Sequence, residues 1–270
     1  MRQYVARRLL QLIPVLLGVS ILVFAVVRII PGDPALIILL GPGGQGVATE
    51  EELQALRQKL GSDQPIHVQY ITWMGRLLRL DLGDSFWTRR PITQELAARL
   101  PLTFELTVLA MVAALSIAIP VGVLSALHQD TWVDYLFRVV TVAGLAIPSF
   151  WLGTLIILFL VIWFRWLPPS GYISFFDNPW ANLQQLVFPA LAMGYRMSAI
   201  TSRMTRSCML EVLRQDYVRT AWAKGLRQRV VLLRHALKNA LLPVVTIAGF
   251  QFALLLGGTV VMETVFNLPG

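Results

Sequence analysis

The feature that most constrains this chain is a run of apolar residues from Leu9 to Ile30, in which Arg28 is the one charged side chain. Spanning a bilayer takes about 20 consecutive apolar residues, so this run is long enough to cross. Four further apolar stretches follow, at residues 102–127, 139–166, 186–202 and 241–261. With 56% hydrophobic and 14% charged residues, against about 25% charged in soluble domains, the chain is predicted to be a multi-pass, all-α membrane protein with five spans.

The first apolar run also resembles a secretory signal peptide, because Arg2, Arg7 and Arg8 precede it. It is longer than the apolar part of a signal peptide, and no small-x-small cleavage site follows it. The run ends instead in Pro31-Gly32-Asp33-Pro34. We therefore predict a retained first span.

Charge in the connecting segments predicts the orientation, because Lys and Arg are in excess on the cytoplasmic side. Residues 203–238 hold nine basic residues against the two acids Glu211 and Asp216, whereas residues 31–100 hold seven basic and eight acidic residues. This bias predicts a cytoplasmic N-terminus, a cytoplasmic loop at 203–240 and an extracytoplasmic segment at 31–100. The predicted organisation is residues 1–30 with the first span, 31–100 outside, and 101–270 as the main transmembrane domain.

The outer segment carries two helix patterns of its own. Thr49-Glu50-Glu51-Glu52 is a capping box that predicts a helix ending at Gly61. A second stripe places two aromatic residues, Tyr70 and Trp73, on one helical face. This stripe is typical of a helix at the membrane interface and equally of a helix packed on a neighbour; both interpretations stay open.

Several classes of function are excluded by what the sequence lacks. It contains no G-x-x-x-x-G-K-[ST] phosphate loop, so any ATP hydrolysis would need another chain. The G-x-G-x-x-G match at residues 41–46 is interpreted as a linker, because it does not lie in a βαβ unit. The single cysteine, Cys208, and three widely separated histidines predict no disulfide, no metal site and no bound cofactor. The net charge of +8 lies in loops beside spans, so we predict contact with lipid and not with nucleic acid.

Three ionisable residues within the predicted spans are candidates for the translocation path: Glu105, Arg196 and Glu263. The two carboxylates lie near predicted outer ends, where they can reach water, and Arg196 can extend to the membrane boundary. None of them completes a nucleophile–base pair, so no catalytic residue is predicted. Four spans contain a proline, at 14, 120, 148 and 243. These are static kinks or hinges, with Pro243 predicted in a first helical turn.

The cytoplasmic loop carries the most informative pattern. Residues 216–225 predict a short helix stopped by Gly225, and a second helix from Leu226 to Asn239 leads to the last span. The small residues Ala221 and Ala223 beside Trp222 would let this helix–turn–helix enter a groove on a partner. A basic loop held by lipid headgroups is the alternative interpretation.

At these residues the sequence resembles the inner-membrane permease subunits of binding-protein-dependent ABC importers, in the dipeptide, oligopeptide and nickel branch. The family's cytoplasmic signature stands here as D-Y-V-R-T-A-W-A-K-G-L from Asp216 and R-H-A-L-K-N-A-L-L-P from Arg234. It corresponds to the E-A-A-x-x-x-G loop of the wider superfamily, with Arg219, Thr220 and Ala221 at the E-A-A positions. This departure favours the peptide branch over sugar or amino-acid importers.

The resemblance extends over nearly the whole chain, through further segments that match in order. They are residues 31–34, 81–85, 100–106, 148–153, 167–172 and 263–270. The family implies the type I ABC importer fold with six spans. This sequence ends where the loop before a sixth span is expected, so the last span is expected to be missing from it.

The resemblance implies an ATP-driven permease that moves peptides or a related solute by alternating access. Its implied partners are a homologous permease, two cytoplasmic ATPase subunits that bind ATP and Mg²⁺, and an extracytoplasmic substrate-binding protein. Dipeptides, oligopeptides, nickel chelates and glutathione all fit the branch. An ion- or proton-coupled carrier using Glu105 or Arg196 is the alternative function, and an intramembrane hydrolase is a distant third. The residues implied to contact the ATPase subunit are Asp216, Arg219, Thr220, Ala221, Ala223, Lys224 and Gly225.

Overall fold

The computed structural model describes residues 2–29, 32–40, 49–85, 88 and 90–270. Within these ranges the regular secondary structure is helical, joined by loops and turns, with one isolated bridge between Asp84 and Pro91. It divides into two compact units, residues 1–97 and 98–270. The glycine-rich match at 41–46 lies outside the described residues.

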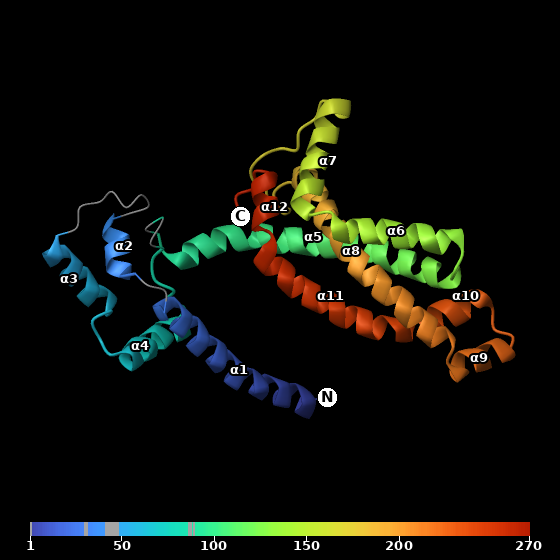
Figure 1. Ribbon diagram of the computed structural model, residues 1–270, viewed down its shortest axis with the longest axis horizontal. Coiled ribbons are helices and arrows are strands. Elements are labelled where there is room, and N and C mark those ends of the chain that lie inside the picture. The colour runs from blue at the N-terminus through green and yellow to red at the C-terminus, as the bar shows by residue number, and fades with distance from the viewer. Residues whose placement is uncertain (1, 30–31, 41–48, 86–87, 89) are drawn as a thin grey trace. The chain divides into compact units, whose positions relative to one another are not determined.

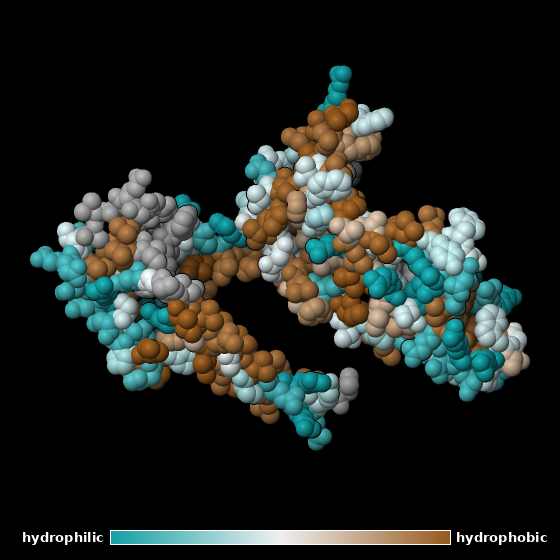
Figure 2. Space-filling model, viewed as in Figure 1, coloured by the Kyte–Doolittle hydropathy of each residue, from teal (hydrophilic) through white to brown (hydrophobic). Residues whose placement is uncertain are grey.

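The first unit contains four helices: α1 (Arg2–Ile29), α2 (Pro34–Leu40), α3 (Glu50–Leu60) and α4 (Ile66–Leu78). Almost every side chain of α1 is exposed, and Figure 2 shows the apolar surface that covers most of it. The predicted capping box is confirmed at Thr49 and Glu52, and Gly61 ends α3 in the left-handed conformation. The helix over 66–78 packs on a neighbour, because the Tyr70 and Trp73 rings lie 5.4 and 5.8 Å from Phe24 of α1.

An ion pair joins α3 to the start of α2. Arg57 Nε donates to Asp33 Oδ2 at 2.6 Å, and the Ala35 amide donates to Asp33 Oδ1 at 2.9 Å. Burial raises the pKa of Asp33, but these hydrogen bonds lower it by more, so its net pKa lies below the ordinary value. The carboxylate therefore stays ionised and holds this outer segment together over the physiological pH range.

The second unit contains the remaining helices, which Figure 1 shows in order along the chain. Here α6 lies against α8, and α11 runs back along α8. The bounds are α5 (Ile92–Leu127), α6 (Trp132–Ala146), α7 (Ser149–Phe164), α8 (Pro179–Leu213), α9 (Asp216–Ala223), α10 (Gln228–Val230), the π-helix η1 (Val231–Leu237), α11 (Lys238–Gly258) and α12 (Val260–Val265).

The core of this unit lies where α5 and α8 cross. Leu102 and Leu106 of α5 pack with Leu186 and Met193 of α8, all fully or almost fully buried. Gly194 permits this close crossing, because a Cβ there would lie 2.8 Å from the carbonyl oxygen of Ala110. The two helices are therefore fitted backbone to backbone at the centre of the unit.

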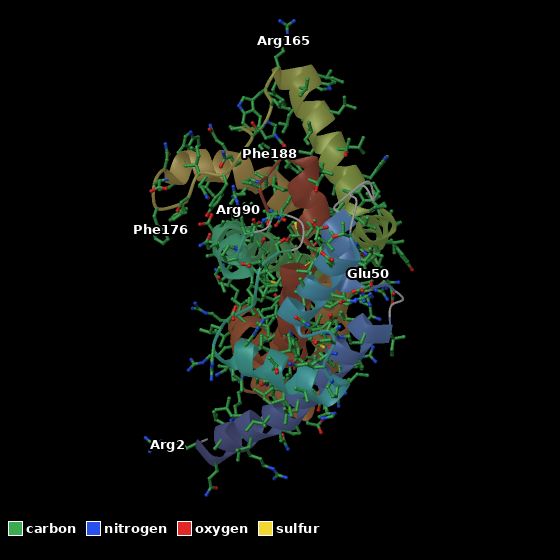
Figure 3. All side chains as sticks on the ribbon, turned by 90° about the vertical axis from the view of Figure 1, so that its left-hand side faces the viewer. Arg2, Glu50, Arg90, Arg165, Phe176 and Phe188 are labelled. Atoms are coloured by element: carbon green, nitrogen blue, oxygen red, sulfur yellow. The ribbon has the colours of Figure 1, made fainter. Side chains whose placement is uncertain are left out.

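The predicted span at 139–166 is wrong as a single helix, because the backbone breaks into α6 and α7 with a bend of 102°. Ile147 is extended, at φ −88° and ψ 122°, and Pro148 precedes the first turn of α7. A proline disfavours the helical conformation in the residue before it, which places the break at this position. Arg165 ends α7 in the left-handed conformation and extends beyond the helix at its tip (Figure 3).

Three helical stretches are long and apolar enough to cross a membrane, Arg2–Ile29, Ile92–Leu127 and Gln228–Gly258, or four crossings if the bent pair α6 and α7 counts as one. The predicted span at 186–202 lies inside α8, which is not among them. The reason is that α8 directs polar side chains such as Gln185 and Thr201 into the bundle and not toward lipid. A count of membrane spans from hydropathy alone therefore misses a helix of this kind.

Pro243 does not lie in a first helical turn, contrary to the prediction. The helical backbone runs without a gap from Gln228 through η1 into α11, so Pro243 lies well inside it. Proline has no backbone N–H to donate to the preceding turn of the helix. The π-helix η1 ends at Leu237, six residues before Pro243.

Candidate functional site

The segment predicted to be a cytoplasmic loop contains the expected helix–turn–helix, although its second helix begins at Gln228 and not at Leu226. The short helix α9 is capped by Lys224, and Gly225 follows with φ 71°, in the left-handed region that glycine adopts without strain. The chain then enters α10 and η1, which continue directly into α11. The turn at Gly225 therefore sets the angle between α9 and the start of a predicted span.

The inner face of this hairpin is a small apolar cluster. Val218 and Val231 are fully buried and Ala221 is 5% exposed, packed together against Val212 and Leu213 at the end of α8. The prediction that Ala221 enters a partner's groove is wrong, because its side chain lies inside the hairpin. Its small size lets α9 approach η1.

The outer face presents aromatic and basic side chains. Trp222 and Tyr217 are 44% and 43% exposed, and Asn239 holds the Tyr217 hydroxyl through a hydrogen bond of 2.9 Å. Around these rings lie the exposed residues Asp216, Arg219, Thr220, Ala223, Lys224, Arg227 and Arg229. Figure 2 shows hydrophilic side chains gathered over α9 and α10, with paler patches between them. Aromatic side chains within a charged rim are typical of a protein-binding surface.

The charges on this face are largely free to pair with another chain. Arg219 lies 3.7 Å from Asp216, but both side chains are more than 70% exposed, so this ion pair contributes little. Thr220 donates its hydroxyl hydrogen to the Asp216 carbonyl oxygen within α9. Of the seven predicted contact residues, six are therefore accessible, and Ala221 supports them from inside.

The three candidates for the translocation path do not converge. Arg196 is exposed on α8, and no ion pair or hydrogen bond to it occurs among the described residues. Glu105 on α5 accepts a hydrogen bond of 2.7 Å from Asn182, which is itself buried and also donates to the Ile173 carbonyl. These contacts make Glu105 part of a fixed connection between α5, the first turn of α8 and the segment before α8.

Glu263 is the residue for which access to water was expected at a span end, and that expectation is wrong. It is 2% exposed and accepts a hydrogen bond of 2.8 Å from Thr103 of α5. Burial and the nearby Glu105 carboxylate raise the pKa of the Tyr172 hydroxyl to about 12. Glu105, which lies on α5, bonds to Asn182 of α8, and Glu263 bonds to Thr103 of α5. Both carboxylates therefore hold α5 to neighbouring segments.

A buried ionic cluster near α9 was not predicted. Asp134, in the first turn of α6, is fully buried and pairs with Arg206 of α8 and with Arg138. Arg138 lies one turn away in the same helix, whereas 72 residues separate Asp134 from Arg206. The available signal was Asp134 itself, an acid close to Arg138 between two apolar stretches, together with an arginine, Arg206, inside a long helix. A polar contact between Thr201 and Gln251 deeper in the bundle was missed for the same reason.

No group of three or more potential metal ligands occurs in the part of the chain that the structure describes. Buried polar side chains lie instead at contacts between helices, such as Asp134 with Arg206 and Thr201 with Gln251.

Comparison with known proteins accounts for the whole chain. Residues 118–270 match the family model "Binding-protein-dependent transport system inner membrane component", and residues 1–107 match the model for the N-terminal part of such membrane components. A putative peptide transport system permease protein of Brucella suis is 41% identical over 270 residues, covering 100% of this chain and 84% of that protein.

Two further relatives are similar over the same length. The dipeptide transport system permease protein DppB of Alkalihalophilus pseudofirmus is 41% identical, over 100% of this chain and 86% of its own. The glutathione transport system permease protein GsiC of Salmonella paratyphi A is 40% identical, over 100% of this chain and 84% of its own. These matches and the helical fold confirm the predicted family, the inner-membrane location and the non-enzymatic role. The chain belongs to the binding-protein-dependent transport system inner membrane components, the permeases of ABC importers.

Proposed function

We propose that this permease imports short peptides as one of two homologous permease subunits, together with two cytoplasmic ATPase subunits and an extracytoplasmic binding protein. The observation that carries the proposal is the α9 hairpin, a rigid turn that presents Trp222 and Tyr217 within a rim of basic residues. Because this chain has no phosphate loop, a separate ATPase must drive transport, and that ATPase must bind the chain at a surface of this kind.

The substrate class is inferred from what the relatives' names share. One is named for peptides, one for dipeptides and one for glutathione, which is itself a tripeptide. Each of these substrates carries a backbone amide and a free carboxylate. We therefore infer a short peptide as the substrate.

Alternating access is the inferred mechanism. ATP binding would close the ATPase subunits and displace α9, and this displacement would reach the transmembrane helices through the end of α8 and through η1. A buried interior that can rearrange between two packings is what such a mechanism requires.

The test is uptake of a labelled peptide into vesicles that contain the assembled transporter. We expect uptake that requires ATP at the ATPase side and persists when ionophores collapse the ion and proton gradients. Uptake driven by a gradient without ATP would instead establish the carrier alternative. In that alternative Glu105 or Arg196 would carry the coupling; Glu105 is held by Asn182, and Arg196 is exposed on α8.

Arg196 provides a separate prediction about the path. If its exposed guanidinium contacts the peptide carboxylate, Arg196→Met should lower uptake about tenfold, as expected for the loss of a charged hydrogen bond. Assembly and ATP hydrolysis without peptide should remain at parental levels. The matched control is Arg203→Met, because Arg203 is also exposed on α8, two turns further along. Equal uptake by the Arg196→Met variant and the parent would remove Arg196 from the path.

A further inference from the structure

Asp134 lies where α5, α6 and α8 meet. Figure 1 shows the turn between α5 and α6 at the same end of the second unit as α9. It belongs to the first turn of α6, and its partner Ser125 belongs to the last turn of α5. Arg206 stands on α8, two turns before that helix ends at Leu213. The cluster therefore ties the turn between α5 and α6 to the final turns of α8.

The Asp134 carboxylate is saturated with donors. Arg206 donates from Nε to Oδ1 at 2.8 Å and from Nη2 to Oδ2 at 2.7 Å, which is a bidentate pair. Arg138 Nη2 donates to Oδ2 at 2.6 Å. The Ser125 hydroxyl donates to Oδ1, and the Asp130 amide donates to Oδ2 at 3.1 Å. A carboxylate offers about four acceptor positions, so these donors leave no position free.

The packing of these helices has other sources. Apolar side chains and Gly194 hold α5 against α8, and Tyr195 of α8 donates its hydroxyl hydrogen to the Val140 carbonyl of α6. These contacts hold the helices together, but none of them is a hydrogen bond between charged groups. A planar guanidinium bound to both oxygens of a buried carboxylate allows one orientation.

The end of α8 also contacts α9. Val212 and Leu213 pack against the buried cluster of Val218, Ala221 and Val231 inside the hairpin. A continuous set of contacts therefore runs from α9 to the end of α8, from Arg206 to Asp134, and from Asp134 to α5 and α6.

We propose that Asp134 is a positioning residue for coupling, which makes the turn between α5 and α6 follow the end of α8 when α9 is displaced. Without this ionic contact, α8 moves when α9 is displaced but the turn between α5 and α6 does not follow. Less peptide is then transported for each ATP hydrolysed. The inference rests on the proposed function, since it takes α9 as the contact with the ATPase subunits.

The first test measures transport for each ATP hydrolysed in the assembled transporter. Asp134→Asn keeps the shape of the side chain and removes its charge. We expect peptide uptake per ATP to fall about tenfold or more, as for a lost hydrogen bond between charged groups. The matched control is Asp177→Asn, an exposed acid of the same unit that lies outside the cluster, which should leave this ratio unchanged. An unchanged ratio in the Asp134→Asn variant would overturn the proposal.

The second test separates coupling from folding. Removing both partners of a buried ion pair is often neutral for stability, whereas removing one is not. Asp134→Leu combined with Arg206→Met should therefore recover the thermal midpoint that Arg206→Met alone loses, while the uptake per ATP stays low. If the double variant recovers both quantities, the cluster has only a structural role and the proposal is wrong.

The third test measures the motion directly and needs no peptide. Cys208 is the single cysteine, so a Cys208→Ala background accepts spin labels at Gln129→Cys, in the turn between α5 and α6, and at Ser207→Cys on α8; both positions are exposed. With Asp134 present we expect one narrow distance between the labels, both without nucleotide and with trapped ATP. With Asp134→Asn the distance should differ between the two states.

These readouts distinguish failure of this inference from failure of the proposed function. If the parent takes up no peptide but keeps one label distance that Asp134→Asn loses, peptide import is wrong and the inference stands. If Asp134→Asn retains both the single label distance and the parental uptake per ATP, the inference is wrong and the proposed function stands.

Discussion

Replacing Ala221 with aspartate is expected to detach the ATPase subunits and abolish ATP-driven uptake, while the permease remains in the membrane. Ala221 is 5% exposed between Val218 and Val231. A carboxylate there would be buried without a partner, which costs several kcal/mol. With eight residues, α9 is too short to persist without that packing. Co-purification of the ATPase subunits and vesicle uptake measure the loss.

Variants on the outer face separate this effect from direct contact with the partner. Ala223→Asp makes the same change two residues later at an exposed position, so α9 should keep its protection from amide hydrogen exchange. Trp222→Ala should also keep α9 folded. It should weaken binding of the ATPase subunits by about 2 kcal/mol, the size expected for an interface hot spot, and so reduce their co-purification. Arg227→Ala, at the rim, should reduce the binding free energy of the ATPase subunits by far less. Protected amides and parental uptake in the Ala221→Asp variant would contradict the assigned role of the hairpin.

The turn itself is expected to tolerate more than its sequence suggests. A Cβ on Gly225 would meet nothing within 4 Å, so a side chain there is opposed by the positive φ alone. This strain amounts to about 1–2 kcal/mol, less than the cost of a carboxylate at Ala221. The hairpin therefore depends more on its apolar interior than on the glycine.

The second large effect is expected at the crossing of α5 and α8. A Cβ at Gly194 would lie 2.8 Å from both the Ala110 carbonyl oxygen and the Ala113 Cβ, and 3.1 Å from the Ala114 amide nitrogen. Backbone atoms cannot turn aside as a flexible side chain can, so Gly194→Leu forces the helices apart. We expect a loss of about 3 kcal/mol, at the upper end of overpacking costs, and little folded protein in the membrane.

Gly249→Leu is the matched control, because Gly249 also lies within a helix but has nothing within 4 Å of its Cβ position. Thermal unfolding of the purified complex compares the two variants. A thermal midpoint for Gly194→Leu equal to that of Gly249→Leu would show that the crossing can open without cost, contrary to the structure.

Local features of this protein could be predicted from its sequence because neighbouring residues decide them. Thr49 and Glu52 satisfy each other's backbone donors, so the start of α3 needs no distant partner. Gly225 marks the turn after α9 because glycine adopts a positive φ without strain. Runs of apolar residues indicated the all-α membrane class, since a helix satisfies its backbone hydrogen bonds within one apolar segment, whereas a β-strand needs neighbouring strands.

Predictions that needed a partner far along the chain were wrong or were not made. Sequence spacing gave no indication that Ala221 faces Val231 or that Glu263 faces Thr103, so their surroundings were misjudged. Likewise, the bend at Pro148 turned a single predicted span into two helices, because an apolar run does not show where its backbone is broken.

The sequence by itself therefore determined the all-α membrane class, the local turns at Thr49 and Gly225, and the family, all of which depend on local conformational preference or on ordered motifs. The tertiary structure decided which polar residues are buried. Asp134 and Arg206 are 72 residues apart and form a bidentate pair only because α6 packs on α8. A buried charge is stable when its partner lies within hydrogen-bond reach, and which residues come within that reach depends on the faces by which the helices pack.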